Sequence, residues 1–292
     1  MKKNSRTAIF PVAGLGTRFL PITKVMPKEM LPIVDKPLIQ YAIEEAKEAG
    51  IEEFILVTGK GKSIIEDHFD DAFELGTSLS KGRKINELRD VEGSTIGSGE
   101  LFYTRQVKPL GLGHAIWCAR RFVREQPFVV IAPDDLVLST RGCLSQMMDV
   151  YDEVGGNLVA VENVPKNQTH KYGILDVTSD DGKIVGAKAL IEKPLPAEAP
   201  STLSIIGRYI LHPEVFTYLE SHEVGKGGEI QLTDAIAKTM DRVPFHGFRF
   251  KGERFDCGSK IGFLAANIAY ALKRNDLGGN VREILKEKYN LG

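Results

Sequence analysis

Short apolar runs alternate with amphipathic stretches along the first half of the chain. The apolar run over residues 7–13, which glycine follows at position 14, is typical of a buried parallel strand, and the runs over residues 53–58 and 128–132 are apolar in the same way. Between the first two runs, apolar residues at 39, 42, 43 and 46 follow the spacing of an amphipathic helix. A second helix is predicted over residues 114–123, before the third run. Strands separated by helices favour a doubly wound α/β sheet.

This alternation changes twice further along the chain. Residues 70–98 are polar and rich in glycine, which indicates an excursion from the main fold. Extended segments then dominate, and helices return near the end; the strands are expected at 158–164, 173–177, 184–191 and 205–211, and the helices at 232–240, 261–274 and 281–289. We expect a single Rossmann-like domain over residues 1–292, with three α/β/α layers and a central mixed, mostly parallel sheet. Its parts would be residues 1–156, a β-rich segment 157–258, and C-terminal helices over 259–292.

Composition narrows the classes of protein. Lys and Arg number 38 and Asp and Glu 39, so the formal charge is 38 − 39 = −1, without the basic excess of a nucleic-acid-binding protein. The three cysteines, an odd number without a C-x-x-C pair, support neither a disulfide framework nor a structural zinc site, and they favour a reducing compartment. The most apolar helix candidate, residues 263–272, is too short to span a bilayer. Pro11 interrupts the run that follows Lys2 and Lys3, which argues against a signal peptide. We expect a cytoplasmic protein with no membrane or nucleic-acid partner.

A glycine-containing bend directly follows the first predicted strand, with the sequence Ala13-Gly14-Leu15-Gly16-Thr17-Arg18. Glycines let a backbone approach a ligand closely and present N–H groups to anionic oxygens. Arg18 adds a forked cation suited to phosphate. A plain strand-to-helix turn is the alternative, but the arginine at the end of a buried strand favours a phosphate site.

Two better-known phosphate motifs do not fit. The dinucleotide fingerprint needs a third glycine where Phe19 stands. Gly61-Lys62-Ser63 could end a Walker A loop between a strand and a helix, but Leu56 occupies the place of its first glycine. We therefore interpret residues 59–63 as a solvated turn, and a P-loop kinase or ATPase as a weak rival.

The next segments resemble the signature of the sugar-phosphate nucleotidyltransferases. Pro27-Lys28-Glu29-Met30-Leu31-Pro32 follows the glycine bend, and matching segments continue at residues 35–41, 111–115, 133–136, 171–173, 192–194, 207–209, 229–234 and 255–258. The resemblance covers almost the whole chain and is closest to bacterial members that use UTP. It implies the nucleotidyltransferase fold and the reversible conversion of UTP and glucose 1-phosphate into UDP-glucose and pyrophosphate, with Mg²⁺ as cofactor. A sugar-phosphate oxygen would attack the α-phosphorus of UTP in line, with no covalent enzyme intermediate.

The resemblance also implies roles for individual residues. The catalytic group would be Arg18, Lys28, Asp134 and Lys193, with Arg18 and Lys28 facing the triphosphate. Asp134 and Asp256 would hold the metal. The nucleotide would contact Ala13, Gly14, Gly16, Thr17, Arg18, Glu29, Gln106, Gly111 and Asp134, with Gln106 and Gly111 at the uracil. The sugar phosphate would contact Asp135, Gly173, Glu192 and Lys193.

Several points stay open. The Gln106 amide could turn to match cytosine, so it does not by itself specify uracil. Asp135 could support the turn rather than the sugar, and Glu29 could orient Lys28 or Arg18. Rival functions are a thymidylyltransferase acting on the same sugar phosphate, and a non-catalytic sugar-nucleotide-binding regulator. The resemblance implies a homo-oligomer, a dimer or tetramer, to which the C-terminal helices could contribute.

Overall fold

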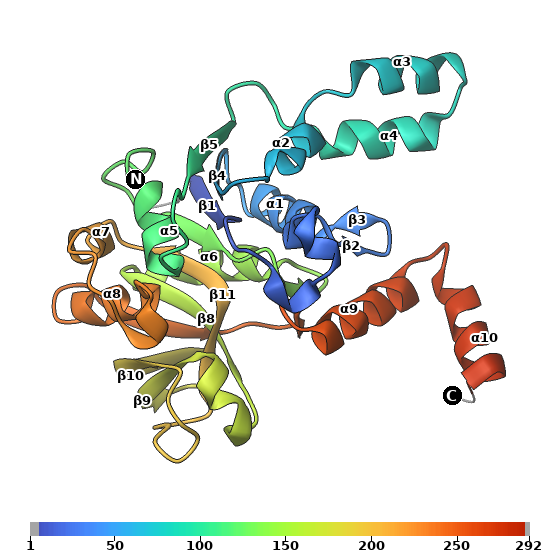
Figure 1. Ribbon diagram of the computed structural model, residues 1–292. Coiled ribbons are helices and arrows are strands. Elements are labelled where there is room, and N and C mark those ends of the chain that lie inside the picture. Colours follow the sequence, from blue (N-terminus) through green and yellow to red (C-terminus); the bar gives the residue numbers. More distant parts are fainter. Residues whose placement is uncertain (1–5, 290–292) are drawn as a thin grey trace.

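One large sheet runs through the protein, for which the computed structural model describes residues 6–289 (Figure 1). Within these residues the sheet has nine strands, in the order β5-β4-β1-β6-β11-β8-β12-β10-β9. Their bounds are β1 Thr7–Pro11, β4 Glu53–Thr58, β5 Leu101–Arg105, β6 Phe128–Ile131, β8 Asn157–Asn163, β9 Gly173–Asp180, β10 Ile184–Glu192, β11 Leu203–Leu211 and β12 Phe245–Arg249. Strands from both predicted parts, residues 1–156 and 157–258, therefore share one sheet.

The sheet is mixed, as expected, but it is not mostly parallel. Among the described strands, four neighbouring pairs are parallel, namely β4–β5, β1–β4, β1–β6 and β8–β12, and four are antiparallel, namely β6–β11, β8–β11, β10–β12 and β9–β10. The β9–β10 connection is a short turn, which can join only antiparallel strands, and β11 enters the sheet against the direction of both neighbours.

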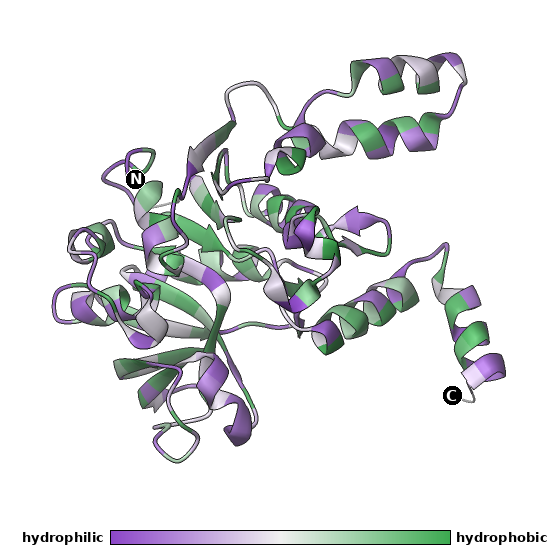
Figure 2. Ribbon diagram, in the orientation of Figure 1, coloured by the Kyte–Doolittle hydropathy of each residue, from purple (hydrophilic) through white to green (hydrophobic). Residues whose placement is uncertain are grey.

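Helices cover both faces of the sheet, giving the expected three layers. Alternate β1 residues point to opposite faces: Ala8 and Phe10 belong to the core under α1 and α6, and Ile9 belongs to the core under α5, α7 and α8. The helix bounds are α1 Leu38–Glu48, α2 Ser63–Phe69, α5 Leu112–Cys118, α6 Cys143–Val154, α7 Val215–Leu219 and α8 Leu232–Thr239. The hydropathy colouring in Figure 2 shows the apolar residues concentrated along the central strands.

Two small two-stranded sheets and five short 3-10 helices accompany the main sheet within the described residues. β7 (Asp135–Leu138) pairs with β13 (Glu253–Asp256), and β2 (Pro32–Ile33) pairs with β3 (Lys36–Pro37). The 3-10 helices are η1 Thr17–Phe19, η2 Ile22–Lys24, η3 Lys28–Met30, η4 Lys166–Lys171 and η5 Lys226–Gly228. The β7–β13 register sets Asp135 opposite Asp256, which brings two distant acidic segments together.

Three helical regions differ from the sequence predictions in extent. The polar excursion contains α3 (Phe73–Lys81) and α4 (Ile85–Ser94), a helical hairpin that stands out from the body in Figure 1. The helix predicted over residues 114–123 ends earlier, because α5 gives way to turns after Cys118. The C-terminal helices are α9 (Lys260–Lys273) and α10 (Gly278–Tyr289), and the last three residues of the chain lie outside the described range.

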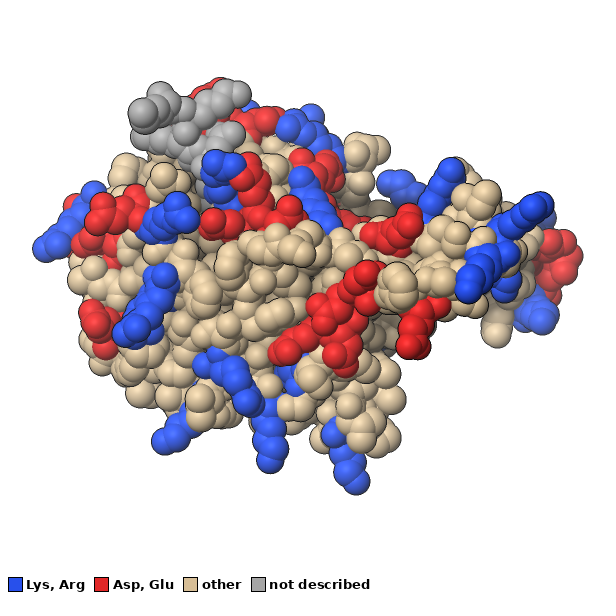
Figure 3. All heavy atoms as spheres, turned by 90° about the horizontal axis from the view of Figure 1, so that it is seen from above, with Lys and Arg blue, Asp and Glu red and all other residues tan. Residues whose placement is uncertain are grey.

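The surface carries mixed charge. Figure 3 shows lysines and arginines interspersed with acidic side chains over the face drawn, in keeping with the balanced composition. Over residues 6–289, no helix combines the length and the apolar character that crossing a bilayer requires.

Candidate active site

Two adjoining cavities open at the carboxyl ends of β1 and β6, where ligands bind in open α/β sheets. The larger has a volume of about 650 Å³, and the smaller, which we call the glycine-bend cavity, about 500 Å³. Both are lined by Leu112, Ala132, Asp134 and Glu229. Asp134 therefore stands where two ligands held in these cavities would meet.

The glycine bend forms the wall of the smaller cavity, through residues 13–17. Gly16 has a φ of 65°, and a Cβ there would lie 3.1 Å from Thr23 Cγ2 and 3.2 Å from Lys28 Cβ. A side chain at Gly16 is therefore both strained and crowded. The hydroxyl of Thr23 donates to the Gly16 carbonyl at 2.7 Å, which fixes the bend against η2.

The side chain of Arg18 faces the larger cavity, away from the glycine-bend cavity. It lines the larger cavity, while Gly16 and Thr17 line the smaller one. Its Nη1 lies 3.4 Å from the carbonyl of Gly258. The structure thus brings Arg18 to the junction of the cavities rather than beside the glycine backbone.

Lys28 and Asp134 form an ion pair at this junction, with Nζ and Oδ2 2.5 Å apart. Burial favours the neutral amine of Lys28, but the carboxylates of Asp134 and Glu29 outweigh it and raise the pKa of Lys28 above its ordinary value. Burial also favours the neutral form of Asp134, which by itself would raise its pKa. The charge of Lys28, the hydrogen bonds to the carboxylate and the charge of Arg18 outweigh this effect, so the pKa of Asp134 is lowered. Both groups are therefore charged at neutral pH, and Lys28 presents a cation to the glycine-bend cavity.

Asp134 and Asp256 converge on Gly258. A Cβ placed on Gly258 would lie 2.9 Å from Asp256 Oδ1, 3.1 Å from Asp134 Oδ2 and 3.3 Å from Arg18 Nη1. Tyr172 donates to the other Asp256 oxygen at 3.1 Å. Only a glycine leaves this space open between two carboxylates and a guanidinium.

The chemistry of this pair fits a hard divalent cation. Within residues 6–289, no group of three or more His, Cys, Asp or Glu side chains could hold a metal by itself. Mg²⁺ is commonly bound by one or two carboxylates together with substrate phosphates and water, which is what Asp134 and Asp256 can offer. A metal held here would need the substrate to complete its coordination.

The side chain of Glu29 lies away from both cavities. It is fully buried and cannot line either cavity, and its Oε2 accepts from Lys62 Nζ at 2.7 Å rather than orienting Lys28 or Arg18 directly. Burial raises the pKa of Glu29 although both lysines oppose it. The predicted turn is confirmed for residues 59–62, while Ser63 already begins α2. Lys62 is buried in an ion pair and is not solvated.

Asp135 supports the fold beside the site. One of its oxygens accepts from the backbone N–H of Gly207 at 2.7 Å, and Arg254 binds both oxygens of the carboxylate. Arg254 also pairs with Glu162 at 2.7 Å. Asp135 lines the larger cavity, but these contacts make it primarily an anchor between β7, β11 and β13.

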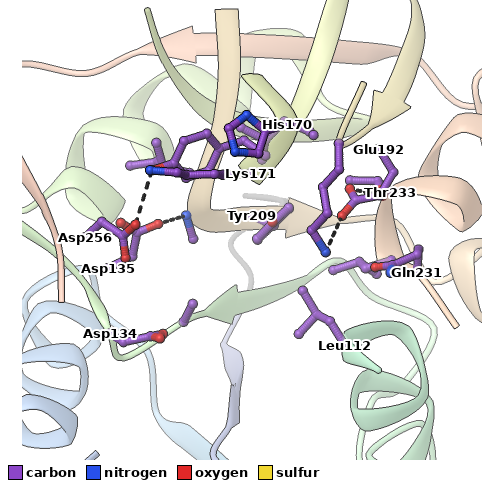
Figure 4. A pocket seen from close by; sticks show the side chains of 18 of the residues that line it. Leu112, Asp134, Asp135, His170, Lys171, Glu192, Tyr209, Gln231, Thr233 and Asp256 are labelled. Atoms are coloured by element: carbon purple, nitrogen blue, oxygen red, sulfur yellow. Dashed lines mark hydrogen bonds and ion pairs between the residues drawn. The ribbon is translucent and has the colours of Figure 1, made fainter. Parts of the chain in front are cut away.

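The far wall of the larger cavity carries Gly173, Glu192 and Lys193. Figure 4 shows Glu192 and Thr233 across the cavity from Asp134, Asp135 and Asp256. Glu192 accepts from the Thr233 hydroxyl at 2.7 Å and pairs with Lys193 at 3.0 Å. The Lys193 backbone has a φ of 48°, an uncommon conformation for a lysine. A cation and a carboxylate thus lie side by side at the end of β10.

Gln106 and Gly111 line the glycine-bend cavity, together with Ala13 and Gly14. Gln106 follows β5 and is buried, and its amide donates to the Gly111 carbonyl at 2.9 Å. Gly111 has a φ of 107°, and a Cβ there would meet Ile230 O at 2.8 Å. Glycine is therefore required at this position.

Sequence reasoning missed three residues that line the larger cavity, Tyr172, Thr233 and Arg254. Tyr172 and Thr233 lay inside segments of the resemblance without a role. Arg254 gave no sequence signal, because its importance comes only from the carboxylates that surround it. The fold is thus an α/β sheet with two adjoining cavities, lined by cations and carboxylates, at the carboxyl ends of its strands.

Comparison with known proteins identifies the family. The family model described as "Nucleotidyl transferase" matches residues 8–273, and the chain belongs to that family. It is 54% identical over 261 residues to the UTP–glucose-1-phosphate uridylyltransferase of Komagataeibacter xylinus, covering 89% of this chain and 92% of that protein. Enzymes of this family generally use a divalent metal.

Solved structures agree with the sequence comparison. A UTP-bound UGPase from Acinetobacter baumannii has a TM-score of 0.89 at 41% identity, covering 97% of this chain and 99% of that one. A UDP-glucose pyrophosphorylase complexed with UDP-glucose has a TM-score of 0.83 at 42% identity, covering 93% and 100%. The predicted α/β nucleotidyltransferase fold is therefore confirmed.

Proposed function

We propose that this protein transfers a uridylyl group from UTP to glucose 1-phosphate, giving UDP-glucose and pyrophosphate in a reversible reaction. The observation that carries the proposal is the meeting of the two cavities at Asp134, beside Lys28 and Arg18. The names of the relatives and the UTP and UDP-glucose bound by the neighbouring structures support these substrates.

In this reaction a phosphate oxygen of the sugar attacks the α-phosphorus of UTP. The new P–O bond forms as the bond from that phosphorus to the bridging oxygen of the β-phosphate breaks, and pyrophosphate leaves with the bonding electrons. The protein needs to position two anions that repel each other and to balance charge on the transferred group. Lys28 and Arg18 would supply the positive charge for that task. Lys193 would hold the sugar phosphate beside Glu192, which would accept hydrogen bonds from sugar hydroxyls.

We propose Mg²⁺ as the metal and Asp134 and Asp256 as its ligands. When bound, the ion would neutralise phosphate charge at the junction of the cavities. The choice of Mg²⁺ rests on oxygen-only ligands and on the two-carboxylate set around Gly258.

A matrix of nucleotides against sugar 1-phosphates, with and without Mg²⁺, tests the function through pyrophosphate release. We expect release from UTP and glucose 1-phosphate that depends on Mg²⁺. Much faster turnover of dTTP than of UTP would favour the thymidylyltransferase. Binding of both substrates without pyrophosphate release in the presence of Mg²⁺ would favour the non-catalytic regulator.

Replacing Lys193 should mainly impair use of the sugar phosphate. We expect Lys193→Ala to raise the KM for glucose 1-phosphate by about 10²-fold, since a charge-assisted contact with phosphate is lost, and to leave the KM for UTP within a factor of about three. Initial rates with each substrate varied in turn measure this.

Lys188→Ala is the matched control for that variant. Lys188 lies on β10, the strand that ends directly before Lys193; it pairs with Asp176 at 3.4 Å and is 66% exposed, so its loss should leave both KM values unchanged. An equal rise in both KM values in Lys193→Ala would contradict the assignment.

The predicted division into parts and the homo-oligomer remain proposals. The outward side of α9 exposes Ile261, Leu264 and Ile268, one helical stripe of apolar side chains that supports self-association, as a dimer or tetramer.

The three cysteines are free, which supports the cytoplasmic location.

A further inference from the structure

The Gln106 amide is held on one side by two hydrogen-bond acceptors. Its Nε2 lies 2.9 Å from the Gly111 carbonyl oxygen and 3.0 Å from Nδ1 of His114. Both Gln106 and His114 are buried, and only Gln106 lines the glycine-bend cavity. His114, on α5, thus stands behind Gln106, the residue that by the family resemblance would contact the uracil.

The Gly111 carbonyl settles which way the amide points. A carbonyl oxygen can only accept a hydrogen bond, so the amide atom facing it must be the NH₂ group. The second amide proton then goes to His114, provided that Nδ1 carries a lone pair. With both protons used, Gln106 can offer the base only Oε1, which within residues 6–289 has no protein hydrogen bond.

The surroundings of His114 keep the ring neutral. Burial lowers the pKa of His114, and the ring of His222, 5.5 Å away, lowers it further. The Trp117 ring also stacks on His114, with centroids 5.8 Å apart, and it contacts the His222 ring at 4.3 Å. A neutral ring has one nitrogen free to accept, and the donor at 3.0 Å selects Nδ1 for that role.

We propose that His114 is a specificity-determining positioning residue, which locks Gln106 as a hydrogen-bond acceptor and so makes the site select uracil over cytosine. The ribose and phosphates of the nucleotide would hold the base in one position. There, N3–H of uracil would donate a hydrogen bond to Oε1 of Gln106. N3 of cytosine carries a lone pair, which Oε1 repels. Thymine has the same N3–H, so this lock does not separate UTP from dTTP.

This inference rests on the proposed function, because it assigns the base side of the glycine-bend cavity. The competing explanation is that His114 only fills space beside Gln106. That role would affect stability and total activity, but it would not change the preference between two pyrimidines. The ratio of kcat/KM for UTP to that for CTP therefore separates the two explanations.

The experiment measures that ratio by pyrophosphate release for the wild type and three variants. His114→Leu removes the acceptor, and we expect the UTP-to-CTP ratio to fall by about tenfold, the net effect of one hydrogen bond. His114→Gln supplies a carbonyl acceptor and should bring the ratio back to within about threefold of the wild type. Trp117→Phe is the control, because it alters packing against the same ring without touching Gln106.

A measurement on the wild type guards against a variant that fails to fold. Nitrogen-15 spectra of the histidine rings should show Nδ1 of His114 unprotonated and Nε2 protonated. The opposite tautomer would overturn the proposal, as would a wild-type ratio in His114→Leu or an equal fall in Trp117→Phe. If the wild type releases no pyrophosphate from UTP, the proposed function itself fails, and the spectra alone then decide whether Gln106 is locked.

Discussion

Asp134→Asn is expected to lower kcat by about 10²–10³-fold, the usual effect of losing one preorganised charge contact at a reacting centre. Asn keeps the shape of the side chain but removes its charge. The change weakens cation binding opposite Asp256 and removes the negative charge from the partner of Lys28, 2.5 Å away. The rate of pyrophosphate release over a series of Mg²⁺ concentrations measures the effect, and the Mg²⁺ concentration for half-maximal rate should rise.

The control for this variant is Asp149→Asn. Asp149 is also paired, with Arg141, but it is 57% exposed on α6 and lines neither cavity. Its loss should leave the rate unchanged. A near-normal rate for Asp134→Asn at low Mg²⁺ would show that the metal assignment is wrong.

Glu45→Ala is expected to lower the free energy of unfolding by about 3–5 kcal/mol, because it leaves a buried guanidinium without its partner. Arg208 is fully buried and binds both Glu45 oxygens, at 2.7 Å for the shortest contact. Glu45 also accepts from the backbone N–H of Leu144 at 2.9 Å, so one carboxylate joins α1, β11 and α6. Arg208 in turn donates to the carbonyls of Ala132 and Gly207, next to the active-site aspartates. Urea unfolding measures the change.

The neighbouring carboxylate provides a matched comparison. Glu44 pairs with Lys36 at 2.7 Å, but it is 39% exposed and its partner 32%, so Glu44→Ala should lower the free energy of unfolding by less than about 1 kcal/mol. If the two variants lost similar stability, burial of the Arg208 pair would not be what holds these elements together.

Local sequence patterns predicted the parts of the fold that depend on neighbouring residues. The alternation of β1, the spacing of α1 and the glycine bend follow from strand and helix periods and from the conformation that Gly16 adopts. The hairpin of α3 and α4 was recognised as an excursion but not as helical, because its polar residues form little core.

The candidate site was predicted as a set of residues rather than as an arrangement. The resemblance supplied Lys28, Asp134, Lys193 and Asp256, and the structure brings the first two into contact across 106 positions. The partner of Glu29 could not be predicted, since Lys62 sits in a turn whose exposure cannot be judged from its composition.

The sequence by itself determined the chemical types available: cations, carboxylates and glycines at the ends of buried strands, in an order typical of one family. Only the tertiary structure decided how β11 runs, which way the Gln106 amide faces and which acid pairs with which base. The reason is physical, because local propensity acts over a few residues, whereas strand order and register bring together side chains far apart in the chain.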